Sequence, residues 1–176
     1  MRIISGKHRG KNLKSFEGFD VRPTSDRAKE ALFSMLMTKV VGCDFLDLCS
    51  GTGAIGLEAI SRGANTVTFV DNSKESLKIC EFNLKSIKES ANLVYSDALN
   101  FLKTTLKTFD IIYFDPPYVF DDIASVLSIV YDRKLLKENG LIIYEHKSDK
   151  PSLETKNLKL INTKKYGIAI LDFYTY

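Results

Sequence analysis

The sequence has no tryptophan, only two histidines and three cysteines, and no long apolar run. Cys43, Cys49 and Cys80 are odd in number and have no paired spacing, which excludes a disulfide framework and favours a reducing compartment. His8 and His146 are far apart in sequence and have no ligand-spaced neighbours, so we expect no metal site. No window approaches the roughly 18 apolar residues that cross a bilayer, so we expect a cytoplasmic protein with no membrane partner.

The composition is that of an ordinary soluble domain. Of the 176 residues, 44% are hydrophobic and 27% are charged, which suits a chain that buries a core and argues against disorder. The opening, MRIISGKHRG, has neither an apolar stretch nor a cleavage site, so we expect no secretory signal. No repeat or flexible linker interrupts the chain, and we therefore predict a single domain over residues 1–176.

Basic residues are concentrated at the N-terminus. Residues 1–14 contain no acidic residue and five basic ones: Arg2, Lys7, Arg9, Lys11 and Lys14. Because the net charge of the whole chain is +3, the remaining residues carry −2. We predict that this segment forms a basic β-hairpin extension over residues 1–20, with strands at 2–6 and 11–16. Its charge suggests an anionic partner, and a solvated terminus is the alternative.

From residue 44 onward, predicted strands alternate with predicted helices. We expect strands at 44–49, 65–70, 92–96, 109–114 and 141–146, and helices at 22–37, 54–62, 72–89, 97–106 and 123–136. Residues 158–176 alternate around Gly167 as an antiparallel hairpin does. Short apolar strands between helices indicate a three-layer α/β fold whose twisted sheet is mostly parallel. Ligands in such folds bind at the carboxyl ends of the strands.

A glycine-rich turn follows the first of these strands. Gly51, Gly53 and Gly56 fit the pattern G-x-G-x-x-G, in the strand–turn–helix context of a dinucleotide-binding fingerprint. Glycines permit a ligand to touch the backbone where a Cβ would block it. A tight connection with no ligand is the alternative. The motif alone does not choose between a nicotinamide, a flavin and S-adenosylmethionine.

Two acidic residues follow the second and third strands. Asp71 lies 20 residues beyond Gly51, where a carboxylate can accept from both ribose hydroxyls of an adenosine. The alternative is that Asp71 or Asn72 caps the next helix, with Glu75 completing a capping box. Asp97 could accept from an adenine amine, and it is equally well placed to cap the following helix.

The fourth strand ends in Asp115-Pro116-Pro117-Tyr118. The prolines fix the backbone and remove N–H donors, so nearby carbonyls face a ligand. Asp115 adds a carboxylate acceptor, and Tyr118 offers a flat face for stacking. The combination suits an exocyclic amine on a planar base, although a rigid turn would also use two prolines.

These residues resemble a known family. DLCSGTG, Asp71, Asp97 and DPPY, within residues 44–146, resemble class I S-adenosylmethionine-dependent methyltransferases that modify exocyclic amines. RIISGKHRGKNL, RPTSDRAKEALFSML, SRGA and KKYGIAILDFY resemble the bacterial 16S ribosomal RNA guanine-N2 methyltransferases of the RsmD type, so the likeness spans nearly the whole chain. Cys49-Ser50 departs from the family, which often has phenylalanine or alanine before its small residue.

The resemblance implies a Rossmann-like fold, S-adenosylmethionine as cofactor, and methyl transfer to the N2 amine of a guanine in 16S rRNA by a monomer acting on a small-subunit particle. The cofactor-binding residues that it implies are Asp47, Ser50, Gly51 and Gly53 for the methionine end, Asp71 for the ribose, and Asp97 with Ala98 for the adenine. The residues implied for the target guanine are Asp115, Pro116, Pro117 and Tyr118. Arg22, Thr24 and Arg27 would lie near the site, and Arg2, Lys7, Arg9 and Lys11 would contact phosphates.

Three other functions compete with this one. An adenine-N6 DNA methyltransferase also uses DPPY, but 176 residues leave little room for a region that recognises a DNA sequence. A nicotinamide-dependent oxidoreductase would explain the glycine turn and Asp71 but gives DPPY no role. A non-enzymatic RNA-binding protein with a vestigial cofactor site is the third.

Overall fold

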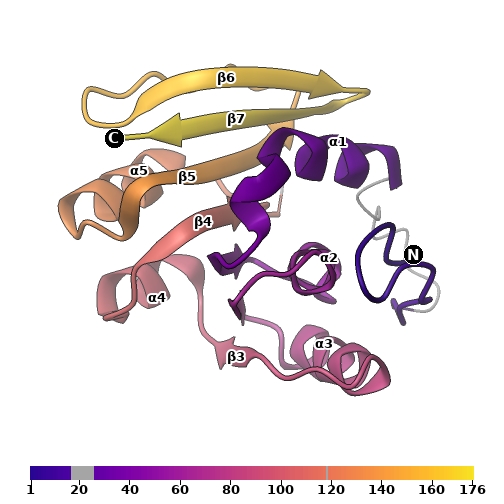
Figure 1. The fold of residues 1–176 in the computed structure, drawn as a ribbon. Helices are drawn as coiled ribbons and strands as arrows, with labels where there is room; N and C mark the ends of the chain where they lie inside the picture. Colours follow the sequence, from indigo (N-terminus) through magenta and orange to yellow (C-terminus); the bar gives the residue numbers. More distant parts are fainter. Residues whose placement is uncertain (17–25, 118) are drawn as a thin grey trace.

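The computed structural model describes residues 1–16, 26–117 and 119–176, and Figure 1 shows their arrangement. The strands are β1 (Asp44–Leu48), β2 (Thr66–Asp71), β3 (Asn92–Tyr95), β4 (Phe109–Phe114), β5 (Leu136–Lys147), β6 (Lys159–Tyr166) and β7 (Ala169–Thr175). The α-helices are α1 (Asp26–Leu36), α2 (Ala54–Ser61), α3 (Lys74–Ser86), α4 (Ala98–Thr104) and α5 (Ile123–Asp132), and a 3₁₀ turn, η1 (Met37–Val40), follows α1. No described helix is both long enough and apolar enough to cross a membrane.

The strands form one seven-stranded sheet in the order β3-β2-β1-β4-β5-β7-β6. Strands β1 to β5 pair in parallel, whereas β7 is antiparallel to both β5 and β6. The chain moves outward from β1 to β3 and then returns to place β4 on the other side of β1. This reversal opens a crevice at the carboxyl ends of β1 and β4, where ligands bind in folds of this type. The predicted three-layer fold with a C-terminal antiparallel hairpin is therefore confirmed.

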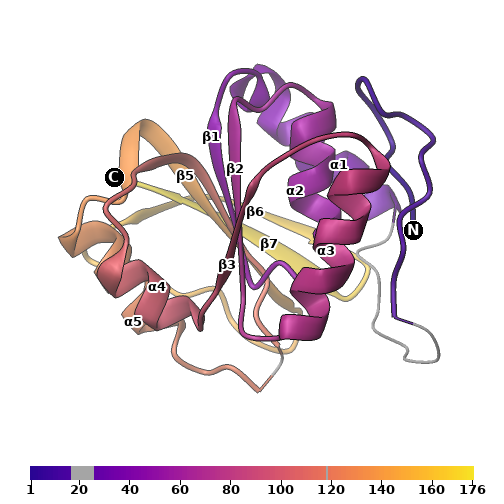
Figure 2. The same cartoon turned by 90° about the horizontal axis from the view of Figure 1, so that it is seen from below.

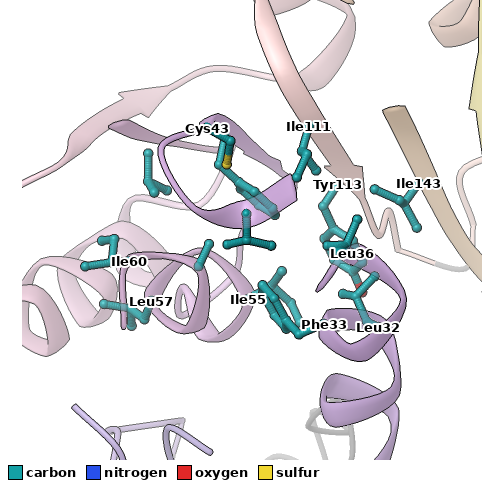
Figure 3. Close-up of a cluster of buried hydrophobic side chains, with 14 of the residues drawn as sticks. Leu32, Phe33, Leu36, Cys43, Ile55, Leu57, Ile60, Ile111, Tyr113 and Ile143 are labelled. Atoms are coloured by element: carbon teal, nitrogen blue, oxygen red, sulfur yellow. The ribbon is translucent and has the colours of Figure 1, made fainter. Parts of the chain in front are cut away.

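Helices cover both faces of the sheet, as the edge-on view in Figure 2 shows. α1, α2 and α3 lie on one face, and α4 and α5 lie on the other. Figure 3 shows the core beneath the first group, where Phe33 of α1 and Ile55 of α2 lie over Ile111 and Tyr113 of β4. The central strands β1, β2 and β4 are mostly buried, which explains why their sequences are apolar rather than alternating, whereas the edge strands β3 and β6 are largely exposed.

Several predicted boundaries were wrong at the ends of elements, including the start of β5, which lies at Leu136 rather than residue 141, and the end of α4, which lies at Thr104 rather than residue 106. The fifth helix ends at Asp132 rather than residue 136, because Lys134 takes a left-handed conformation and Leu136 already pairs with Phe109 in the sheet. The third helix ends at Ser86 rather than residue 89, and Lys88 is again left-handed. The first helix gives way to η1 after Leu36, and its predicted start at residues 22–25 lies outside the described residues.

The predicted N-terminal hairpin is present as a path of the chain but not as two strands. One antiparallel bridge joins Arg2 to Asn12, and Leu13 N donates to Met1 O at 3.0 Å. The arm, which we define as residues 1–14, turns back on itself against α2 and α3 rather than projecting from the domain. Ile3 and Leu13 are buried in the core, so the arm is part of the packed structure.

Glu58 of α2 fixes the start of the arm. Its two carboxylate oxygens accept from the backbone N–H groups of Ile4 and Ser5 at 2.8 and 3.0 Å, although its side chain is fully buried. Lys29 and Arg62 lie at 3.7 and 2.8 Å from the same carboxylate. Burial lowers the pKa of Lys29, and the charge of Glu58 opposes this shift. A buried carboxylate with this many partners is costly to disturb.

We expect Glu58→Ala to lower the free energy of unfolding by about 3–5 kcal/mol, because it leaves the Lys29 ammonium buried without its carboxylate. Urea denaturation followed by circular dichroism measures this change. Glu81→Ala is the matched control, since Glu81 forms only a solvent-exposed ion pair with Lys85 and should change stability by less than about 1 kcal/mol. Equal losses in the two variants would contradict the anchoring role of Glu58.

Candidate active site

The glycine-rich turn between β1 and α2 is held in place by two carboxylates. Asp71, at the end of β2, accepts from Gly51 N at 2.8 Å through Oδ2. Asp47, in β1, accepts from Gly56 N at 2.8 Å through Oδ2. The two bonds fix the start of the turn and the first turn of α2, so the shape of the loop is set by its neighbouring strands.

Asp47 lies beneath the loop rather than beside it. The residue is only 2% exposed, and burial raises the pKa of its carboxyl to about 8 despite the hydrogen bond from Gly56. The predicted role of Asp47 is to hold the methionine end of a cofactor. In this structure, its contact is with the backbone that would form the floor of such a site.

The three glycines of the turn serve different purposes. A Cβ on Gly53 would lie 2.5 Å from Cys80 Sγ, and one on Gly56 would lie 2.2 Å from Phe69 Cε1. These two positions are glycine because helix and strand pack closely. Gly51 has a φ of +53° and open space where its Cβ would be. Our expectation that ligand approach explains all three glycines is not needed for Gly53 and Gly56, and for Gly51 it stays a prediction.

Ser50 supplies a second sign of a ligand beside this loop. Its hydroxyl oxygen is buried and makes no hydrogen bond to any described residue. Buried hydroxyls almost always have a partner, so an orphan is explained by a missing ligand or water. Its backbone N–H donates to Val70 O at 2.9 Å, which fixes the residue at the crevice. The donor set thus fits a polar ligand placed over Gly51.

A cavity of about 310 Å³ lies at the carboxyl ends of β1, β2, β3 and β4. It is lined by Cys49, Asp71, Asn72, Ser96, Asp97, Ala98, Leu99, Asp115, Pro117 and Phe120. Three aspartates predicted from separate strand ends therefore share one space. Asp71 Oδ1 accepts from Ser73 N at 2.8 Å, and each carboxylate oxygen retains a further lone pair for a hydroxyl.

Helix caps account for part of this geometry. Asp97 caps α4 and accepts from Asn100 N at 2.8 Å while it lines the cavity, so the capping alternative is confirmed. The cap of α3 is Ser73, whose hydroxyl accepts from Ser76 N at 3.1 Å. Our alternative of a cap by Asp71 or Asn72 was wrong, because the turn places the helix start one residue later.

Asp115 lines this cavity, and a second cavity of about 140 Å³ is lined by the two prolines that follow Asp115. The second cavity is lined by Pro116, Pro117, Phe120, Tyr144, Glu145, His146, Lys147, Asp149 and Lys150. Pro117 and Phe120 line both spaces, and Pro117 O accepts from Phe120 N at 2.8 Å. The two cavities therefore border the same tight turn. Tyr118 lies outside the described residues.

Sequence analysis missed Glu145, a second carboxylate beside Asp115. Phe114 pairs with Tyr144 across β4 and β5, so the two acidic residues follow the same pair. The Tyr113 hydroxyl donates to Glu145 Oε2 and holds its carboxylate in place. Burial and the charges of Glu145 and Asp47 raise the pKa of Asp115 well above its ordinary value. Glu145 lies beside Asp115 because β4 pairs with β5, and no local sequence motif predicts that pairing.

The described residues that are predicted to contact nucleic acid lie in the arm and in the first turn of α1. Lys7 pairs with Glu89 at 2.7 Å, and Arg2 pairs with Asp26 at 3.1 Å. Arg9 and Lys11 are exposed, and Arg27 is exposed in the first turn of α1. Arg22 and Thr24 lie outside the described residues.

Two of the cysteines are poor candidates for nucleophilic catalysis. Burial raises the pKa of the Cys43 and Cys49 thiols to about 12, which makes both poor nucleophiles. Between residues 1–16, 26–117 and 119–176, no group of three or more histidine, cysteine or acidic side chains is arranged to hold a metal ion.

Comparison with known proteins decides the family. The model of the family described as "Conserved hypothetical protein 95" matches residues 1–175. Ribosomal RNA small subunit methyltransferase D of Haemophilus influenzae is 35% identical over 99% of this chain and 93% of its own length. The chain belongs to this family, the RsmD family. The resemblance noted in the sequence is thereby confirmed.

Solved structures agree with this membership. The Escherichia coli protein yhhF superposes with a TM-score of 0.88 at 31% identity, covering 99% of this chain and 96% of its own. The Thermus thermophilus 16S rRNA N2 methyltransferase RsmC, solved in complex with AdoMet and guanosine, has a TM-score of 0.69 at 25% identity. It covers 90% of this chain, which covers 44% of RsmC. As an RsmD-family member, the chain is an S-adenosylmethionine-dependent methyltransferase with the class I fold.

We expect Gly51→Ala and Gly56→Ala to fail in different ways. Gly51→Ala adds a Cβ into open space beside the cofactor and should weaken binding of S-adenosylhomocysteine at least tenfold, beyond the roughly 1–2 kcal/mol of left-handed strain. Gly56→Ala forces a contact with Phe69 and should lower the free energy of unfolding by about 1–3 kcal/mol while the folded fraction still binds. Calorimetric titration and urea denaturation of both variants separate the effects. Unchanged affinity in Gly51→Ala would contradict this assignment.

Proposed function

We propose that this chain transfers the methyl group of S-adenosylmethionine to the exocyclic N2 amine of a guanine in 16S ribosomal RNA. The single observation that carries the proposal is that two cavities border the turn after Asp115 and share Pro117 and Phe120. One cavity is lined by Asp71 and Asp97, which suit the ribose and adenine of the cofactor, and the other opens on Pro116. The names of the family relatives and the guanosine bound to RsmC support the same base and the same RNA.

The proposed cofactor contacts use groups already oriented by the fold. Ser50, Gly51 and Gly53 would hold the methionine end, with Asp47 supporting the loop from below. Asp71 would accept from the ribose hydroxyls, and Asp97 with Ala98 would border the adenine. When bound, S-adenosylmethionine supplies a methyl group already activated by its sulfonium charge, so the protein has to align rather than activate it.

Asp115 and Pro116 act on the amine. The lone pair of the guanine amine is delocalised into the ring, which makes the nitrogen a poor nucleophile. Hydrogen bonds from its two N–H groups to the Asp115 carboxylate and the Pro116 carbonyl favour the pyramidal form, in which the lone pair faces the methyl group. As the new N–C bond forms, the C–S electron pair stays on sulfur and the nitrogen becomes able to lose a proton. Alignment of this kind can contribute about 7–11 kcal/mol in favourable models.

The raised pKa of Asp115 suits its second task. A carboxyl whose pKa lies closer to neutrality accepts a proton more readily than an ordinary aspartate, and burial and Glu145 provide that shift. Asp115 therefore both orients the amine and receives the proton it releases. Tyr113 keeps Glu145 in position through its hydroxyl.

The substrate RNA is proposed to meet the exposed positive charges of the arm and of α1. Arg9, Lys11 and Arg27 would contact phosphates, which fixes position without selecting sequence. Arg22 and Thr24, from the sequence motif, and Tyr118, as a stacking surface, complete the proposed RNA contacts. The target guanine leaves its stack to reach the second cavity, which favours loops in a small-subunit particle. We propose that the chain acts as a cytoplasmic monomer in one domain.

Mapping of the product tests the proposal directly. Small-subunit particles from cells that lack the gene should gain one N2-methylguanine when incubated with the protein and S-adenosylmethionine, as mass spectrometry of RNA fragments shows. Methylation of adenine in DNA instead would favour the N6 alternative. Binding of NAD but not of S-adenosylhomocysteine would favour an oxidoreductase.

We expect Asp115→Ala to abolish turnover while the dissociation constant for S-adenosylhomocysteine changes less than about threefold, because Asp115 contacts the amine. Asp71→Ala should do the reverse and weaken cofactor binding first, because it loses the ribose contact and the Gly51 anchor. Calorimetric titration and transfer of radiolabelled methyl to RNA measure the two effects. Near-normal turnover in Asp115→Ala would overturn the proposed mechanism.

Glu145→Gln should move the pH dependence of turnover to lower pH. The charge of Glu145 raises the pKa of Asp115, so its removal lets Asp115 ionise at lower pH. The rising limb of kcat against pH reports the ionised Asp115, and its midpoint should therefore fall in the variant. The glutamine carbonyl can still accept from Tyr113, which preserves the local structure. An unchanged midpoint would show that Glu145 does not tune Asp115.

A further inference from the structure

Asn83 of α3 joins two segments that the proposed mechanism treats separately. The residue has no exposed surface, and its side-chain amide is surrounded by backbone groups rather than by other side chains. Its Oδ1 accepts from Lys14 N at 2.7 Å. Its Nδ2 donates to Lys14 O at 3.0 Å and to Thr52 O at 3.1 Å. One buried amide therefore contacts both the arm and the glycine-rich loop.

The bonds of Asn83 use both of its N–H hydrogens and its carbonyl oxygen. Because the amide is fully buried, a loss of any of these bonds leaves a polar group without water to replace the partner. Lys14 cannot move away from α3 without breaking two of them. The position of the arm is thus tied to the group that holds Thr52.

The hydrogen bond from Asn83 fixes the loop at Thr52, between two glycines. Thr52 stands between Gly51 and Gly53, both of which have positive φ and few restraints from a side chain of their own. Ordering such a segment costs conformational entropy when a ligand binds. The carboxylates of Asp71 and Asp47 hold Gly51 and Gly56, whereas the Thr52 carbonyl between them is held by Asn83.

We propose that Asn83 is a positioning residue that couples RNA binding by the arm to cofactor binding by the glycine-rich loop. RNA that restrains the arm holds Lys14 on Asn83, which holds the Thr52 carbonyl and keeps the loop in its binding shape. Each ligand then raises the affinity for the other by the same factor. This inference rests on the proposed function, because it takes RNA as the ligand of the arm and S-adenosylmethionine as the ligand of the loop.

Two substitutions of Lys14 isolate the coupling. Lys14→Ala and Lys14→Pro both remove the ammonium, which lies 5.3 Å from the centre of the Phe82 ring, and so lose the same charge toward RNA. Only Lys14→Pro also removes the N–H that donates to Asn83. The Lys14 side chain is exposed, so neither change removes a core side chain. Asn83→Ala removes the side-chain amide that joins the arm to the glycine-rich loop. Asn92→Ala is the control, because it removes an amide from β3, outside both segments.

The experiment measures the dissociation constant of S-adenosylhomocysteine for the full chain, without and with saturating small-subunit particles from cells that lack the gene. We expect RNA to tighten this binding at least about fivefold in the wild type, Lys14→Ala and Asn92→Ala. The factor should fall below about twofold in Lys14→Pro and Asn83→Ala. Titration of RNA with and without S-adenosylhomocysteine must return the same factors by linkage, which checks the measurement. A merely structural role for Asn83 would weaken binding of the ligands without lowering the coupling factor.

Two results would overturn the inference. The first is a wild-type chain that binds both ligands with no effect of one on the other. The second is a coupling factor in Lys14→Pro equal to that in Lys14→Ala. The comparison of these two variants tests the inference even if thermal unfolding shows that Asn83→Ala is not folded. A wild-type chain that fails to bind S-adenosylhomocysteine or RNA at all would instead overturn the proposed function on which the inference rests.

Discussion

The glycine-rich turn depends on two carboxylates that reach it from adjacent strands. Asp71 and Asp47 accept from the N–H groups of Gly51 and Gly56, at the start of the turn and in the first turn of α2. Parallel pairing of β1 with β2 brings these carboxylates to the same edge of the sheet. Without both bonds, a segment rich in glycine would have many accessible conformations, and the cavity beside it would have no fixed wall.

Burial of polar groups organises the rest of the molecule in the same way. Glu58 holds the start of the arm and Asn83 holds its end, and both side chains are fully removed from solvent. A buried carboxylate or amide must be paired, so each fixes the backbone groups around it. The arm is consequently as well positioned as a strand would be, although it contains only one bridge of regular structure.

Burial also raises the pKa of Asp115 in the candidate active site. Asp115 lies among other carboxylates, and their charges together with burial favour its protonated form. Asp97 caps α4 and lines the cavity at the strand ends at once. Capping therefore does not exclude the proposed role of Asp97 in cofactor binding. The next helix after Asp71, α3, is capped by Ser73 and not by Asp71.

Local patterns in the sequence were sufficient for the alternation of strands and helices, the glycine turn, and the acidic residues at strand ends, because each depends on neighbours within one or two turns of the chain. They could not place Glu145 beside Asp115 or Asn83 against Thr52, since these contacts depend on strand pairing and helix packing between distant segments. Local patterns also did not predict that packing excludes a Cβ at Gly53 and Gly56, because the atoms that exclude it belong to the distant residues Cys80 and Phe69. The sequence by itself determined which chemical groups are available and on which elements they lie. Only the tertiary structure decided which of them share a cavity, because proximity across a sheet follows from the order in which its strands pair.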